Sequence, residues 1–368
     1  MKIYWASDYD NVGNAYGYTR HNSLMREYTS RLADLSEDAD IALTILSADK
    51  YKPVLGKYNI LFTMFEALDL PDSYVDGCRR ADELIVPCRF CRDLFKRYLP
   101  GKKISVCWEG VEGEKFTFKE RAFTPGVGEK FRILWVGAPN PRKGYGTMIQ
   151  IADALANHPE FEIYLKTSTP KVDYESLKDK LTKEEIEAVR QEIRGYERVN
   201  KIKEGEIKTL SDLLITKGNV VFDSRNLSLP DLIDLYHSAH CFVFPTVGEG
   251  WGLTLCEAMT TGLPCVSPVH TGVSEFFSED VGFTVRHKIS EPVDLPAYDM
   301  KARFHLPYTE DVLGRILQIY NNYALAKRKA ARGARLIREK FTWNQAARRL
   351  VEICEKAQSR ANYLSMVA

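Results

Sequence analysis

A glycine-rich turn in FPTVGEGWGLTLCE, residues 244–257, has the residue types with the most chemical content in this chain. We predict that a buried strand ends at Pro245 and that a helix begins near Leu253. The first N–H groups of a helix lack partners within it and lie at the positive end of its dipole, so an anion binds there readily. Gly250 and Gly252 have no side chain that would keep a phosphate from the backbone. The sequence therefore predicts a phosphate-binding turn at the start of this helix.

Two glutamates of this segment, Glu249 and Glu257, are placed to contact sugar hydroxyls. Glu249 lies on the turn and Glu257 about one turn inside the helix, so the pair could hold two sugar rings on either side of one diphosphate. The alternative is that both are ordinary surface glutamates. The apolar neighbours of Glu257 argue against that alternative, because a lone acid among apolar side chains requires a specific partner.

A second candidate phosphate site lies in LWVGAPNPRKG, residues 134–144, where a predicted strand leads into a glycine-containing loop. Arg142 and Lys143 are adjacent cations in this loop, and such a pair suits a diphosphate. The alternative is an exposed pair of loop charges.

Short apolar runs that alternate with amphipathic stretches surround these loops, which indicates parallel sheets covered by helices. The length of 368 residues predicts two domains. The stretch 121–130 is rich in Gly and Pro and is typical of a linker, so we expect domains over 1–125 and 126–340. The charged stretch near 171–214 is predicted to be a helical insertion on the second domain. Strands are predicted at 41–46, 60–64, 83–86, 104–108, 131–136, 161–167, 219–222, 241–244 and 264–267, and helices at 22–35, 89–98, 144–157, 231–237, 253–261 and 343–359.

The order of these motifs resembles that of the family-4 retaining glycosyltransferases. Glu249 and Glu257 fit the E-x7-E motif of that family, and residues 272–275 (GVSE) resemble its Gly-x-x-Glu turn. The loop at 134–144 resembles the loop with which the family grips the donor diphosphate. Residues 341–343 (FTW), followed by a helix, resemble its closing segment, in which the last helix returns to the first domain.

This resemblance implies an α/β protein of the GT-B type, with two Rossmann-like doubly wound domains facing each other across a cleft. It implies that segment 341–368 belongs with the first domain. The implied activity is metal-independent transfer of a sugar from a nucleoside diphosphate sugar, which is a co-substrate, so no cofactor is expected. Glu249, Lys143, Arg142 and Glu66 are the expected catalytic residues. The expected donor-binding residues are Gly13, Arg142, Lys143, Asp223, Arg225, Glu249, Gly250, Trp251, Gly252, Leu253, Thr254 and Glu257.

The sequence departs from the family pattern at two places. Lys143 matches the family's lysine, but Ala138 stands where many members have arginine, so Arg142 is the candidate substitute. Many relatives also have a histidine of the first domain near the reacting carbon, whereas no histidine lies between His21 and His158. Glu66, at a predicted strand end in TMFEALDLP, is our candidate polar group for that region; the alternative is an ordinary loop glutamate. The loop Asp10 to Tyr18, with Gly13 and Gly17, is implied to close over the donor phosphate and the acceptor.

Several other chemistries are disfavoured. Asp8-Tyr9-Asp10 spells a D-x-D metal signature of a different fold, and coincidence is the preferred interpretation. Cys88 and Cys91 form one CxxC without the second pair that a structural zinc site needs. A nicotinamide enzyme is disfavoured because no strand leads into GxGxxG with an acid about 20 residues later. A sugar-nucleotide epimerase or hydrolase of the same fold and a non-catalytic sugar-nucleotide-binding subunit stay open.

The overall composition and charge restrict the kinds of partner and the cellular compartment that we expect. A formal net charge of +1 argues against a chain that is basic throughout and binds nucleic acid. No apolar run reaches the roughly 18 residues of a transmembrane helix, and the first residues lack the apolar core of a signal peptide. Eight scattered cysteines suit a reducing cytoplasm. The acceptor is left open among a glycan, a lipid-linked sugar, a protein, a metabolite and a modified nucleic acid.

Overall fold

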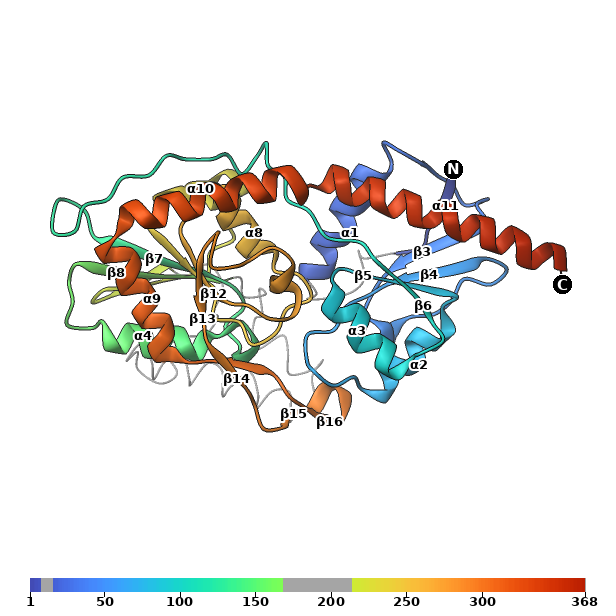
Figure 1. The fold of residues 1–368 in the computed structure, drawn as a ribbon, viewed down its shortest axis with the longest axis horizontal. Helices are drawn as coiled ribbons and strands as arrows, with labels where there is room; N and C mark the ends of the chain where they lie inside the picture. Colours follow the sequence, from blue (N-terminus) through green and yellow to red (C-terminus); the bar gives the residue numbers. More distant parts are fainter. Residues whose placement is uncertain (8–15, 168–213, 368) are drawn as a thin grey trace, which may run out of the picture.

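The computed structural model describes residues 1–7, 16–167 and 214–367, and in it the chain forms two lobes that lie side by side (Figure 1). Gly13, Asp8 and Asp10 lie outside the described residues, as does nearly all of the predicted insertion at 171–214.

The first lobe contains a six-stranded parallel sheet in the order β2-β1-β3-β4-β5-β6. Its central strands are apolar and buried along their whole length, as in β3 (IALTI), because helices cover both faces of a parallel sheet. Its elements are β1 (Lys2–Trp5), α1 (Tyr16–Thr29), β2 (Asp34–Leu35), β3 (Ile41–Ile45), β4 (Tyr58–Phe62), α2 (Asp72–Arg80), β5 (Glu83–Val86), α3 (Arg89–Tyr98) and β6 (Lys103–Val106).

The second lobe contains a seven-stranded sheet in the order β13-β12-β11-β7-β8-β10-β9, in which β9 alone is antiparallel to its neighbour. Its strands are β7 (Phe131–Val136), β8 (Phe161–Lys166), β9 (Leu214–Lys217), β10 (Val220–Asp223), β11 (Cys241–Val243), β12 (Cys265–Pro268) and β13 (Phe283–Val285). Its helices are α4 (Tyr145–Ala154), α7 (Leu229–Ser238), α8 (Leu253–Thr260), α9 (Thr309–Asn321) and α10 (Tyr323–Lys340).

The last helix, α11 (Trp343–Val367), continues beyond α10 onto the first lobe, and the two helices run along one side of both lobes (Figure 1). Trp343, Leu350 and Ile353 of α11 join the hydrophobic cluster that also contains strands β1, β3 and β4.

The second sheet reverses its strand order between β7 and β11. The chain enters at β7, continues with β8, β9 and β10 on one side, and then with β11, β12 and β13 on the other side. Ligands of open α/β sheets bind outside the carboxyl ends of the strands at such a point. The loops that follow β7 and β11 are those that the sequence analysis singled out, so the fold brings both phosphate-binding candidates to one edge.

The prediction of a doubly wound α/β fold is confirmed, while one predicted helix is wrong in its position. The helix expected at 22–35 is α1, which begins at Tyr16 and ends at Thr29. Asp34 and Leu35 instead pair with Lys2 and Ile3 as the edge strand β2. Tertiary pairing with β1 therefore overrides the helical period of this segment.

Candidate active site

The loops after β7 and β11 are locked to each other through their backbones. Val247 N–H donates to the Arg142 carbonyl at 3.0 Å. Gly144 adopts a φ of 73°, and a Cβ at this position would lie 2.1 Å from the Pro245 carbonyl oxygen. The indole N–H of Trp135 donates to the Lys143 carbonyl at 3.1 Å. These contacts set the direction in which the side chains of Arg142 and Lys143 leave the loop.

Glu249 and Lys143 form the shortest ion pair of this edge. Lys143 Nζ lies 2.6 Å from Glu249 Oε1, Arg142 Nη1 lies 3.4 Å from the same oxygen, and the Thr246 hydroxyl donates to it at 3.0 Å. Glu249 is 5% exposed. Burial alone would raise its pKa, but Lys143 and Arg142 outweigh burial and hold the pKa below its usual value. The carboxylate is therefore ionised and fixed.

Glu257 lies inside α8 and is also buried. Its Oε2 accepts a hydrogen bond from the Tyr236 hydroxyl at 3.0 Å, and Arg20 of α1 lies 3.5 Å from its Oε1. Burial raises the pKa of Glu257, and Arg20 and Tyr236 oppose that rise. The helix begins after Gly252, which has a φ of 115° that a residue with a Cβ rarely adopts. The helix start and both glutamates thus occupy the positions that the sequence predicts.

Asp223 and Arg225, two of the expected donor-binding residues, lie at the end of β10, and two strands of the sheet order separate them from β11. Arg225 binds Asp223 through both its Nε and Nη2, at 3.0 and 2.8 Å, and the Tyr164 hydroxyl donates to Asp223 at 2.7 Å. No hydrogen bond or ion pair joins them to the Glu249 cluster within the described ranges. The structure therefore brings Arg142, Lys143 and Glu249 into one cluster but keeps Asp223 and Arg225 in another.

Glu66 reaches the cluster from the other lobe. Its Oε1 lies 3.7 Å from Arg142 Nη1. The two lobes touch here, because a Cβ at Gly248 would lie 2.2 Å from the Glu66 carbonyl oxygen and a Cβ at Gly250 would lie 2.2 Å from the Met64 sulfur. Glycines at 248 and 250 are thus required for this close approach between the lobes.

A hairpin of the second lobe provides a further contact that the sequence analysis did not anticipate. Strands β15 (Val293–Leu295) and β16 (Met300–Ala302) extend from the ribbon of β14 (His287–Ile289) and β17 (His305–Pro307) toward the first lobe (Figure 1). Arg303 forms a two-pronged ion pair with Asp69 at 2.6 and 3.0 Å, and Tyr298 packs on Phe65 and Tyr74 with ring centroids 5.6 and 6.1 Å apart. The strands are only three residues long, which is too short for a periodic signal.

Two further charged residues of the first lobe were missed. Arg20 joins Glu112 at 3.3 Å and Glu257 at 3.5 Å, so it bridges the lobes. Glu109 follows β6 and is buried at the same edge as Glu66. In the sequence, only the position of Glu109 directly after a predicted strand could have marked it as a candidate site residue.

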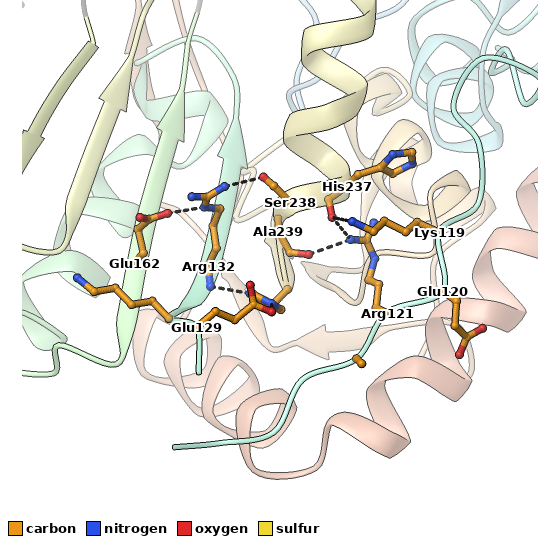
Figure 2. Close-up of a pocket in the computed structure, with 12 residues that line it drawn as sticks. Lys119, Glu120, Arg121, Glu129, Arg132, Glu162, His237, Ser238 and Ala239 are labelled. Atoms are coloured by element: carbon orange, nitrogen blue, oxygen red, sulfur yellow. Dashed lines mark hydrogen bonds and ion pairs between the residues drawn. The ribbon is translucent and has the colours of Figure 1, made fainter. Parts of the chain in front are cut away.

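A cavity of about 400 Å³ lies away from this cluster, beside the linker between the lobes (Figure 2). The guanidinium of Arg121 points into the protein and donates to backbone carbonyls of His237, Ala239, Thr261 and Gly262, at the ends of α7 and α8. Burial lowers the pKa of Arg121 to about 10. The hydrogen-bond donors of Arg121 are thus used at the ends of α7 and α8, where they join the linker to both helices.

Cys88 and Cys91 are buried free thiols at the start of α3, where the Cys88 sulfur accepts from the Cys91 N–H. In the part of the chain that the structure describes, no helix combines the length and the apolar character needed to cross a membrane.

The sequence is similar to known proteins over part of its length. Residues 182–350 match the family described as "Family 4 Glycosyltransferase in conflict systems". Mannosylfructose-phosphate synthase from Agrobacterium fabrum is 25% identical over 225 residues, which are 61% of this chain and 40% of that protein. The chain thus spans well under half the length of this curated relative.

Solved structures show the fold. The Anabaena HepE protein in complex with UDP-glucose superposes with a TM-score of 0.62 at 13% identity, covering 97% of this chain and all of that one. Sucrose-phosphate synthase from Thermosynechococcus elongatus gives a TM-score of 0.60 at 15% identity, over 93% of this chain and 79% of that one. Over residues 182–350 the chain is therefore similar to the family-4 glycosyltransferases, and it has the GT-B fold of these solved structures.

Proposed function

We propose that the protein transfers a sugar from a nucleoside diphosphate sugar to an acceptor hydroxyl with retention of the anomeric configuration. The observation that carries this proposal is the cluster of the buried Glu249 with the half-buried Lys143 and Arg142 at the reversal of strand order. Two cations beside a helix start, with one ionised carboxylate between the lobes, suit a diphosphate attached to a polyhydroxylated ring. We further propose UDP as the nucleotide, because the Anabaena relative is known with UDP-glucose.

The roles that we propose for these residues depend on where negative charge develops during the reaction. As the bond between sugar and phosphate breaks, negative charge builds on the departing diphosphate, and groups already fixed around it lower the barrier without reorganising. Lys143, Arg142 and the N–H groups of residues 252–254 would supply this stabilisation without a metal ion. Glu249 would hold hydroxyls of the transferred sugar, and Glu257 would hold the ribose.

We propose that the donor binds to residues 126–340 and the acceptor to residues 1–125 with the returning segment 341–368. The acceptor class stays open among glycans, lipid-linked sugars, proteins, metabolites and modified nucleic acids. The eight cysteines are free and buried, which supports the proposal of a reducing cytoplasmic setting.

A panel of sugar nucleotides tests the proposal. A UDP-sugar is expected to raise the melting temperature, because a ligand of the folded state stabilises it by mass action. The same donor should be turned over in the presence of an acceptor extract, at equal rates with and without EDTA. Activity that EDTA abolishes and Mg²⁺ or Mn²⁺ restores would contradict metal independence and would make Asp8 and Asp10 candidate ligands. Binding without turnover would point to a non-catalytic subunit, and turnover without transfer to a hydrolase or epimerase.

Glu66→Gln separates the two substrates. We expect the Kd for UDP to stay within about twofold of the wild-type value, whereas transfer falls about tenfold or more, because an acceptor held by one hydrogen bond fewer is less well oriented. Asp69→Asn is the matched control in the same loop, since Asp69 binds Arg303 of the hairpin and not the cluster. Equal losses of UDP affinity and transfer in Glu66→Gln would contradict this division between the lobes.

A further inference from the structure

Glu109 is held rigidly at the carboxyl edge of the first sheet. The next residue, Gly110, lies so close to the start of α11 that a Cβ would meet the Trp343 nitrogen at 2.2 Å, and Val111 N–H donates to the Phe341 carbonyl at 3.0 Å. The Glu109 side chain is 3% exposed. Its backbone therefore has no freedom to carry the carboxyl out to solvent.

In the part of the chain that the structure describes, no lysine or arginine lies within ion-pair distance of Glu109, in contrast to the other buried acids between the lobes. Glu249 has Lys143, and Glu112 and Glu257 share Arg20. Among the described residues, the one charge-capable group within ion-pair distance of Glu109 is the Nδ1 of His21, at 3.4 Å.

His21 does not supply a positive charge. Its ring is fully buried on α1, edge-on to Phe62 with centroids 4.5 Å apart, and 5.9 Å from the Trp343 ring. Burial lowers the pKa of His21 to about 3, so the imidazole is neutral at neutral pH and at mildly acidic pH. An ionised Glu109 would therefore be a buried charge without an ion-pair partner among the described residues, which is costly.

The groups that face Glu109 come from both lobes. Burial, then the charges of Glu249 and Glu66, raise the pKa of Glu109 to about 8, against the opposing effect of Lys143. A charge on Glu109 raises the pKa of Cys256 in α8, so Glu109 lies near the first turn of the helix that we assign to the diphosphate. Burial keeps the thiols of Cys256 and Cys107 protonated at neutral and mildly alkaline pH, because it raises their pKa values far above the usual range. The titratable groups that face Glu109 are His21, Glu66, Cys107, Lys143, Glu249 and Cys256.

We propose that Glu109 is a positioning residue of the donor site and that its carboxyl is neutral when the nucleoside diphosphate is bound. Binding in alkaline solution therefore draws one proton from the solvent onto this carboxyl. This inference rests on the proposed donor. A diphosphate brings at least two negative charges into the space beside Glu109, and like charges at short range in a poorly solvated site cannot all ionise. Protonation of Glu109 removes that repulsion, so that Lys143 and Arg142 can interact with the diphosphate.

Calorimetric titration with UDP in two buffers of different ionisation enthalpy measures the proton directly. At pH 9 the UDP phosphates are fully ionised, and we expect uptake of close to one proton per UDP bound, against about one tenth of a proton at pH 7. The Kd should rise by up to about tenfold per pH unit above pH 8. Glu109→Gln, which keeps the shape and removes the titration, should abolish the uptake and flatten the pH dependence. Glu114→Gln, an exposed neighbour, should retain both.

Three other outcomes would contradict the role of Glu109 or the proposed donor. UDP binding at pH 9 without proton uptake would overturn the role of Glu109. Uptake that persists in Glu109→Gln would assign the proton to another group, such as Lys143, whose pKa burial lowers from 10.5, and would also overturn it. Failure of UDP to bind at any pH would contradict the proposed donor.

Melting temperatures test Glu109 without ligand. An unfolded glutamate ionises near pH 4.5 while folded Glu109 keeps its proton to about pH 8, so its contribution to stability is full below pH 4.5 and is lost as the pH rises to 8. The melting temperature of Glu109→Gln minus that of the wild type should therefore increase from pH 5 to pH 8 and then level off. A difference that is constant across this range would mean that Glu109 is ionised in the fold, which overturns the inference.

Discussion

Lys143→Ala is expected to slow sugar transfer at saturating donor by about 30- to 1,000-fold. This corresponds to on the order of 2–4 kcal/mol of barrier, the range seen when one preorganised electrostatic group is removed. The cation acts mainly in the transition state, because charge builds on the diphosphate only as the glycosidic bond breaks. Lys143 Nζ is already oriented by Glu249 at 2.6 Å, so it needs little rearrangement to meet that charge. The measurement is the transfer rate at saturating UDP-sugar.

Variants of neighbouring cations give the controls for Lys143. Lys143→Arg should restore the rate only in part, since a planar guanidinium does not reproduce a compact ammonium. Arg142→Ala should lower the rate less than Lys143→Ala, because Arg142 divides its contacts between Glu66, Glu249 and the Gly248 carbonyl. Lys130→Ala, in the exposed linker, should be neutral. A Lys143→Ala protein with a normal melting temperature and the wild-type rate would show that the start of α8 alone holds the diphosphate.

Glu249→Ala is expected to lower turnover by about 30- to 150-fold with a smaller change in the Kd for UDP. Removing a buried acceptor of charge-assisted hydrogen bonds typically costs on the order of 2–3 kcal/mol, and hydroxyl contacts that strengthen in the transition state appear in the rate. Its removal also leaves Lys143 and Arg142 without their common partner. A loss of turnover that is larger than the loss of UDP affinity would therefore indicate that Glu249 contacts the transferred sugar and not the nucleotide.

Glu257→Ala should show the opposite ratio. Glu257 lies inside α8 and bonds Tyr236 and Arg20, and in the proposed site it meets the ribose, which does not react. We expect the Kd for UDP to rise about tenfold with a small effect on the rate at saturation. Both constants can be obtained from steady-state kinetics plus UDP titration. Wild-type constants in both variants would refute the interpretation of the E-x7-E motif.

The sequence by itself determined the parts of this protein that depend on local signals. The strand at 131–136 and the helix at 89–98 have the predicted bounds, since continuous apolar runs and a 3.6-residue period are properties of short segments. The turn before Leu253, our candidate anion site, could be predicted equally well, because glycines mark it and a helix start needs no distant residue to attract a phosphate.

Only the tertiary structure decided which charges meet. Glu66 and Arg142 are 76 positions apart and come from different lobes, and nothing in either segment predicts their 3.7 Å approach. The edge strand β2 replaced the end of a predicted helix because pairing with β1 outweighs local propensity. Glu109 became unusual only when the fold buried it beside a neutral histidine and other acids, since a pKa is set by solvent exposure and neighbouring charges in space, not by neighbours in the chain.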